Sequence, residues 1–248
     1  MSIQELHYDF KFKVDKVDSL QNENFLPAEI DWILNEAVAI YIKQRFGTNN
    51  SKKIGFEGDQ KRIQDLKSLH IKCPTNIQPA VVPILVSTGV YELRLSQLTF
   101  DFLFLTRGSA LASKTNCGQR VISLKEVQND DYNDVSIDPF WKPSFEWREC
   151  PVNFGRTDTL LSDKGSIYLY TNGDFNIDEV YIEYLKYPNK VSIGGYNYID
   201  GNPSVLTECD LPEETHREIV DIAVTECSRI ITNPNFLQIT QSKQLVNE

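Results

Sequence analysis

The sequence is short of the residue types that most often carry enzyme chemistry. Histidine occurs three times in 248 residues, and none of the three has a second candidate ligand at metal-binding spacing. Nucleophile-elbow and phosphate-binding loop patterns are also missing. These absences argue against a metalloenzyme and against a nucleotide-binding enzyme. We therefore expect a protein with no catalytic residues, no bound metal and no cofactor.

Cysteine is scarce as well, with five residues in the chain. No two of them form a CxxC pair, so the sequence favours neither a zinc site nor a disulfide framework. An odd number of widely spaced cysteines is typical of reduced thiols in a cytosolic setting. The cysteines are Cys73, Cys117, Cys150, Cys209 and Cys227.

Long apolar runs and excess positive charge are both absent. No apolar run reaches the roughly 18 residues that a membrane-spanning helix requires, and residues 1–15 lack the apolar core of a secretory signal. We expect neither a signal peptide nor contact with a membrane. The formal net charge of −10 argues against binding to nucleic acid by phosphate neutralisation. An acidic wall could nevertheless surround DNA without holding it, because it repels phosphates.

Two amphipathic stretches at opposite ends of the chain are the strongest structural signal that is present. Residues 26–46 and 211–232 both begin with Leu-Pro-x-Glu, which suits a helix start because proline is tolerated at the first helical position. Each stretch then carries apolar residues at helical spacing. Neither helix is stable alone, because ordering its backbone costs more than its apolar burial returns. We expect the two helices to pack together, and a shorter helix over residues 58–70.

Between these helices, apolar and polar residues alternate with the period of strands. Residues 78–87 contain two prolines, which fits an edge strand or an irregular segment better than a central strand. A turn signal at Asn172–Gly173–Asp174 predicts a hairpin between the last two strands, and residues 128–143 indicate an acidic loop. Residues 7–15 also alternate, so we expect an edge strand or an arm there. The other predicted strands cover residues 90–96, 99–107, 119–126, 144–152, 166–172 and 179–188.

These elements predict an α+β fold in which a large antiparallel β-rich insertion separates the N-terminal from the C-terminal helices. We divide the chain into an N-terminal helical part at residues 1–75, a β-rich domain at 76–205, and a C-terminal helix with a docking tail at 206–248. We expect the last part to pack back on the N-terminal helices.

Two isolated features could carry chemistry, but each has a simpler structural explanation. Oxygen-bearing side chains alternate from Asn172 to Asp178, with Glu183 beyond them, and resemble part of a calcium-binding loop. Ile177 stands where that loop needs glycine, so a plain hairpin turn is the favoured interpretation. His216 lies beside glutamates in the first turn of the last predicted helix, and we expect a surface histidine there.

Aromatic residues are concentrated in the later strands and their loops, between Tyr132 and Tyr198. Such a concentration fits a sheet core, an interface with another subunit or partner, or a platform for binding sugars. The sequence alone does not separate these three roles. Trp141 and Trp147 are our candidate interface residues within this region.

The C-terminal segment 235–248 is polar overall but contains apolar residues at intervals. A terminal extension of this kind is normally disordered, so its apolar residues suggest that it docks on another chain. The predicted interface residues of the tail are Phe236, Leu237, Ile239, Leu245 and Val246.

The order of these elements resembles a family of phage structural proteins. The segment EVYIEYLKYPNKVSI at residues 179–193 is followed by a loop and then by LPEETHREIVDIAVTECSRI at residues 211–230. This arrangement is similar to the adaptors that form the head–tail connector ring of short-tailed bacteriophages. It resembles more particularly the tail ring proteins of crAss-like phages. The resemblance covers most of the chain in layout and includes no catalytic signature.

The resemblance implies a non-enzymatic virion protein, made in the host cytoplasm, that assembles into a ring, usually a dodecamer. Such a ring would lie below the portal and beside other tail ring proteins, and DNA would pass through it without specific binding. Its helical part would stack around the axis, and its C-terminal segment would embrace the portal. Two alternatives stay open on the residues: a carbohydrate- or receptor-binding β module that uses the aromatics of 132–198, and a hydrolase with a carboxylate pair.

Overall fold

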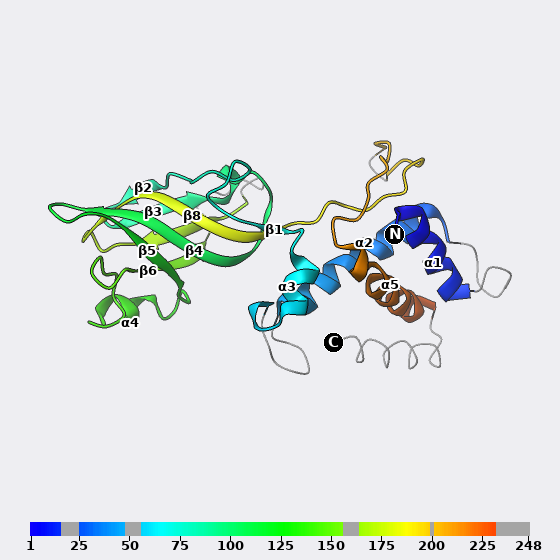
Figure 1. Cartoon of the computed structure of the whole chain (residues 1–248), viewed down its shortest axis with the longest axis horizontal. Helices are drawn as coiled ribbons and strands as arrows, with labels where there is room; N and C mark the ends of the chain where they lie inside the picture. Colours follow the sequence, from blue (N-terminus) through cyan, green and yellow to red (C-terminus); the bar gives the residue numbers. More distant parts are fainter. Residues whose placement is uncertain (16–24, 48–55, 156–163, 199–200, 232–248) are drawn as a thin grey trace. The chain divides into compact units, whose positions relative to one another are not determined.

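Both ends of the chain belong to one structural unit, and the middle of the chain forms a second unit (Figure 1). In this computed structural model the helical unit comprises Met1–Leu69 and Pro188–Glu248, and the β unit comprises His70–Tyr187. The structure describes residues 1–15, 25–47, 56–155, 164–198 and 201–231. The α+β class is confirmed, with helices in the terminal segments and a large sheet in the middle. The domain limits drawn at residues 75/76 and 205/206 stay a prediction.

The helical unit brings together helices from the two ends of the chain. They are α1 (Ile3–Asp15), α2 (Pro27–Phe46), α3 (Gln60–Leu66) and α5 (His216–Ile231). Helix α5 packs against α2 and α1, and α3 packs against α2. At the start of α2 the backbone N–H of Leu26 donates to Glu29 Oε2 at 2.8 Å, which satisfies one of the donors that a helix start leaves open. The long helices expected near residues 26–46 and 211–232 are therefore present.

Residues 7–15 belong to helix α1, so the edge strand or arm expected there is wrong. Ile3, Leu6 and Phe10 are buried, and their spacing of three and four residues is that of one helix face. Tyr8 and Phe12 are exposed. The alternating aromatic residues have the spacing of a strand, but packing of the buried face against α5 stabilises the helix.

The third predicted helix is shorter than residues 58–70. Asp59 caps the start of α3, since its Oδ1 accepts the backbone N–H of Lys61 at 3.0 Å. The helix ends at Leu66, and His70 already belongs to the first strand. The buried Leu69, which follows α3, therefore belongs to the turn that leads into the sheet.

The β unit is built on one eight-stranded sheet, with the order β1-β8-β4-β5-β6-β7-β3-β2. Its strands are β1 (His70–Ile71), β2 (Ile84–Ser87), β3 (Val90–Arg94), β4 (Phe102–Lys114), β5 (Gly118–Glu126), β6 (Glu149–Gly155), β7 (Ser166–Tyr170) and β8 (Asn176–Lys186). All neighbouring strands are antiparallel except β5 and β6, which are parallel. The sheet is antiparallel, as predicted, in all but this pair. Strand β2 lies at one end of the order, which agrees with the prolines that precede it.

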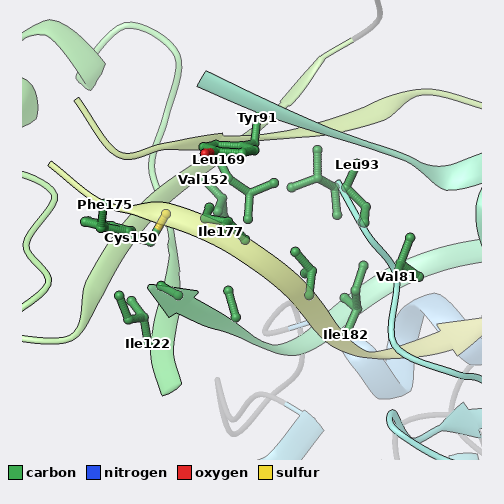
Figure 2. Packing of buried hydrophobic residues seen from close by; sticks show 14 of the residues in the cluster. Val81, Tyr91, Leu93, Ile122, Cys150, Val152, Leu169, Phe175, Ile177 and Ile182 are labelled. Carbon is green, nitrogen blue, oxygen red and sulfur yellow. The ribbon is translucent and has the colours of Figure 1, made fainter. Parts of the chain in front are cut away.

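The sheet curls around a hydrophobic core, part of which is shown in Figure 2. Val81, just before β2, forms an isolated bridge with Val180 of β8, so segments from the two ends of the strand order meet. Three of the later aromatic residues, Phe145, Phe175 and Tyr184, are buried in this core. The core role proposed for the aromatic concentration is confirmed for these three.

The turn at Asn172–Gly173–Asp174 forms, but it does not close a hairpin. Asn172 and Gly173 have φ values of 51° and 77°, and the Asp174 N–H donates to the Thr171 carbonyl at 3.0 Å. Strand β7 nevertheless pairs with β6 and β3, whereas β8 pairs with β4 and β1. The hairpin prediction is wrong because the long β4, which is distant in sequence, occupies the place beside β8.

Residues 128–143 are more than an acidic loop, because they contain helix α4 (Tyr132–Ile137). The segment belongs to the connection between β5 and β6. Parallel neighbours need a crossover of about a dozen residues or more, commonly with a helix, and this connection is that crossover. The sequence interpretation missed the helix because so short an element gives little periodicity.

Candidate assembly surfaces

The interface residues predicted from the sequence fall into two groups. Trp141 and Trp147 lie in the β unit and are 60% and 69% exposed. The tail residues lie outside the described part of the chain, and their role stays a prediction. The tail residues are Phe236, Leu237, Ile239, Leu245 and Val246.

Trp141 and Trp147 have two exposed apolar neighbours in sequence, Ile137 at the end of α4 and Phe140 just after it. We call these four residues the 137–147 surface. Scattered single apolar residues on a protein surface need no explanation, whereas these four are large, exposed and close in sequence, and their interface role stays a prediction. The indole ring of Trp141 also has the ammonium group of Lys125 5.7 Å from its centroid.

Hydrogen bonds hold the segment that carries the 137–147 surface in a defined shape. The Oδ1 atom of Asp138 accepts the backbone N–H of Phe140 at 2.8 Å. Ser144 and Glu149 exchange two backbone hydrogen bonds, each of 3.0 Å. Phe145 is buried in the core, between the two exposed tryptophans in sequence. The exposure of the tryptophans is therefore imposed by an anchored segment.

A buried ionic cluster joins three helices of the helical unit. The Nε atom of Arg45 in α2 lies 3.1 Å from Asp65 Oδ2 in α3, and its Nη2 atom contacts Glu218 in α5. The exposed Lys61 adds a contact of 3.2 Å to Glu218. Burial would lower the pKa of Arg45, but Tyr41, Glu218 and Asp65 raise it, so the guanidinium stays charged. Burial raises the pKa of Asp65 despite the opposing charge of Arg45.

A second polar cluster surrounds the carboxylate of Asp31 in α2, which is buried. It accepts hydrogen bonds from His7 Nε2 at 2.7 Å, from the Tyr196 hydroxyl at 2.6 Å and from the Ile193 N–H at 3.0 Å. Burial alone would raise the pKa of Asp31, but these donors outweigh it and lower the pKa below its usual value. Asn35, one turn further along α2, exchanges two hydrogen bonds with the backbone of the segment that contains Ile193. Helices α1 and α2 are thus tied to the segment that follows β8.

Comparison with known protein families gives one match over nearly the whole chain. A family model described as phage tail ring protein 3/4 matches residues 1–233. The chain belongs to this tail ring family. No curated protein matches it. The resemblance seen in the sequence is confirmed: this ring protein is a structural component of the phage tail, from a family that assembles into rings.

The match includes the whole β unit, the described helices of the helical unit and the 137–147 surface, and it ends before the predicted docking tail. The two polar clusters and the exposed tryptophans of the ring protein therefore lie in the part of the chain that the family covers. The tail residues from Phe236 onward do not.

The position of His216 in the ring protein differs from the sequence prediction. The predicted surface position is wrong, because His216 is buried and its Nε2 atom lies 3.0 Å from the Leu211 carbonyl oxygen. A short 3₁₀ turn over Glu213–Thr215 precedes α5. The turn places the His216 imidazole against the backbone of Leu211, which precedes the helix.

The alternating acidic residues considered for calcium have protein partners. Asp174 pairs with Lys114 at 2.6 Å, and Asp178 accepts hydrogen bonds from the side chains of Ser113 and Gln119. In the described ranges no group of three or more His, Cys, Asp or Glu side chains is placed to hold a metal ion. The residues around this turn therefore hold strands β4, β5 and β8 together.

The buried thiols of the ring protein are poor nucleophiles. Burial raises the pKa of Cys150 to about 12 and that of Cys227 to about 11, so both stay protonated. All five cysteines are free thiols. None of the helices within the described residues combines the length and the apolar character that crossing a membrane requires.

Proposed function

We propose that this chain forms a closed ring in the head–tail connector of a phage, where it links the portal to the tail and surrounds the channel through which DNA leaves. The observation that carries the proposal is the match of residues 1–233 to the phage tail ring protein 3/4 family. The role is non-enzymatic: the protein acts by binding its neighbours and by the shape of the assembly.

The charge of the chain supports a passive channel. With a net charge of −10, the protein does not offer the cationic surface that holds DNA phosphates. DNA would therefore slide through the ring without specific binding, because the acidic protein repels it. Portal binding and ring closure would instead depend on apolar contacts.

Ring closure requires two different surfaces on every copy, which meet head to tail. Trp141 and Trp147, on the 137–147 surface, are exposed and anchored, which is what such a surface needs. The apolar residues of the 235–248 tail would contact the portal, and other tail ring proteins would be the remaining neighbours. We expect a dodecamer.

The mass of the purified protein in solution, alone and with a portal protein, tests this proposal. A large closed oligomer, or a complex that forms only when portal is present, is the expected result. Native mass spectrometry would count the copies. A protein that remains monomeric at all concentrations and ignores the portal would contradict the proposal.

The exposed tryptophans also favour a second candidate, a carbohydrate- or receptor-binding module, because an open indole face suits a sugar ring. Glycan-array binding that is lost in Trp141→Ala and Trp147→Ala, while assembly stays intact, would support this alternative. Absence of glycan binding together with ring formation would leave the connector function in place.

A further inference from the structure

Strand β2 carries the side chains of an interior strand although it lies at an edge of the sheet. Its first three residues, Ile84, Leu85 and Val86, form a continuous apolar run, as in strands that are covered on both faces. All of its residues are nevertheless exposed, Leu85 to 59% and Val86 to 51%. Successive side chains of a strand point to opposite faces, so both faces of β2 are open in the single chain.

The surroundings of β2 lack the charged residues that usually protect an exposed edge. Residues 73–91 contain no Asp, Glu, Lys, Arg or His, although charged residues make up 24% of the chain. Natural edge strands use such charges to avoid pairing with other chains. Pro83 and a register shift between Leu85 and Ser87 limit the open edge to a short stretch. A short edge suits one defined contact better than open-ended aggregation.

The segment that leads into β2 is held in place by buried contacts. The Oε1 atom of the buried Gln78 accepts hydrogen bonds from the Thr99 N–H at 2.9 Å and from the Tyr184 hydroxyl at 3.2 Å. Val81 exchanges backbone hydrogen bonds of 3.0 and 2.8 Å with Val180 of β8. A partner that binds β2 therefore does not have to order it first, which lowers the cost of binding.

In a ring, β2 needs a complementary surface other than itself. Contact of β2 with β2 is isologous and stops at a dimer, whereas a ring closes through two different surfaces. The 137–147 surface is another concentration of exposed apolar side chains in the β unit. Helix α4, which leads into it, lies on the opposite side of the β unit from β2 (Figure 1). The indole N–H of a tryptophan can also donate to the carbonyl groups that an edge strand leaves free.

We propose that β2 of one copy binds the 137–147 surface of the next copy, and that this contact closes the ring. The inference rests on the proposed function in that it takes a second copy of the chain as the occupant of β2. It adds the identity of the two surfaces and the head-to-tail direction of the contact.

The first test places a charge on β2 in the full-length chain. In Val86→Lys the added ammonium would be buried at the contact without a partner, so the concentration at which the oligomer dissociates should rise by at least about tenfold. Sedimentation velocity over a dilution series measures this shift. Val121→Lys is the matched control, because Val121 is 53% exposed on β5 of the same sheet. It should assemble like the unmodified protein, and Val86→Lys should keep the melting temperature of that control.

The second test uses two variants that each keep one surface. Val86→Lys retains the 137–147 surface, and a Trp141→Ala/Trp147→Ala variant retains β2. Below its raised dissociation concentration each variant alone should remain monomeric, while their mixture at the same concentration should give a one-to-one complex that does not grow. That complex forms because the intact surface of one variant binds the intact surface of the other, and the two altered surfaces end the assembly.

Several results would overturn the inference. Val86→Lys that assembles like the control would show that β2 lies outside the contact, and dimers of the tryptophan variant alone would show that β2 pairs with itself. An unmodified chain that stays monomeric would count against the proposed function separately. The β2 contact is then tested by mixing Val86→Cys and Trp141→Cys copies, both carrying Cys117→Ser, with a bismaleimide. Absence of a cross-linked pair would refute the contact.

Discussion

A single carboxylate, that of Asp31, connects three parts of the helical unit. Its hydrogen bonds reach His7 in α1 and both Ile193 and Tyr196 in the segment after β8. A buried carboxylate without partners would be strongly destabilising, so these donors are necessary where Asp31 lies. The same donors make the stability of the helical unit depend on the ionisation of this group.

The stability that Asp31 provides should be lost in acid. Because its pKa is lowered in the folded state, its contribution is complete above about pH 4, the usual carboxyl pKa, and disappears as the pH falls through the folded-state pKa. Asp31→Asn should cost about 2 kcal/mol near neutral pH, where hydrogen bonds to the charged form are lost. Hydrogen exchange of α2 amides, compared near neutral pH and near pH 3, measures both effects.

Asp9→Asn is the matched control for that experiment. Asp9 pairs with Lys13 on the partly exposed side of α1, where a salt bridge is worth at most about 1 kcal/mol. The difference in stability between Asp31→Asn and the unmodified chain should shrink in acid, since the carboxylate is then protonated. A difference that stays constant with pH would show that Asp31 acts by packing alone.

At the scale of elements, α2 is held by ionic as well as apolar contacts. Arg45, near its C-terminus, contacts Asp65 in α3 and Glu218 in α5, and both the guanidinium and Asp65 are buried. Removing one member of a buried pair costs more than the pair contributes, because the remaining charge has no partner. The cluster therefore fixes the register of the three helices more than it adds to their stability.

Arg45→Met should destabilise the helical unit by about 3–5 kcal/mol, because it leaves the buried Asp65 without its cationic partner. Lys61→Met removes an exposed cation from the same Glu218 and should cost at most about 1 kcal/mol. Urea unfolding, followed by exchange of α2 and α5 amides, compares the two variants. Equal losses in both would contradict the burial argument.

The elements that the sequence predicted correctly are those whose pattern is set locally. The long helices show a continuous apolar side, and the predicted strands overlap β2 to β8. Strand β4 nevertheless continues to Lys114, beyond the predicted end at residue 107, and β6 begins at Glu149 and not at residue 144. Helix α1 was mistaken for a strand because its exposed Tyr8 and Phe12 alternate with Phe10, and only packing against α5 decides between the two. The pairing of β4 with β8 could not be predicted, since it joins segments far apart in sequence.

At the scale of the whole molecule, assembly depends on surfaces that the folded chain leaves uncovered. The sequence pointed to Trp141 and Trp147, which are exposed, because aromatic residues are concentrated in the later strands and their loops. It predicted an edge strand or an irregular segment at residues 78–87, but did not single out β2 as a surface, because the exposure of its side chains depends on what the rest of the sheet covers. Asp31 and Arg45 were also missed, although a charged residue on the apolar side of a predicted helix was an available signal.

Deleting residues 235–248 should weaken binding to the portal and assembly of the ring while the monomer stays folded. The reason is that the last described helix, α5, ends at Ile231, whereas the apolar residues of the tail have a predicted role only in docking. Circular dichroism checks folding, and sedimentation with and without portal checks assembly. Unchanged assembly after the deletion would refute the docking role of the tail.

The division of the helical unit between the two ends of the chain has a consequence for the order of events during synthesis. The β unit is continuous in sequence and can fold as soon as Tyr187 has left the ribosome. Helices α1 and α2 are made first but must wait for α5, which covers them. An interrupted polypeptide would therefore keep its early helices uncovered and remain a target for chaperones and proteases. Completion of the helical unit thus acts as a check that only copies synthesised through α5 leave translation fully folded.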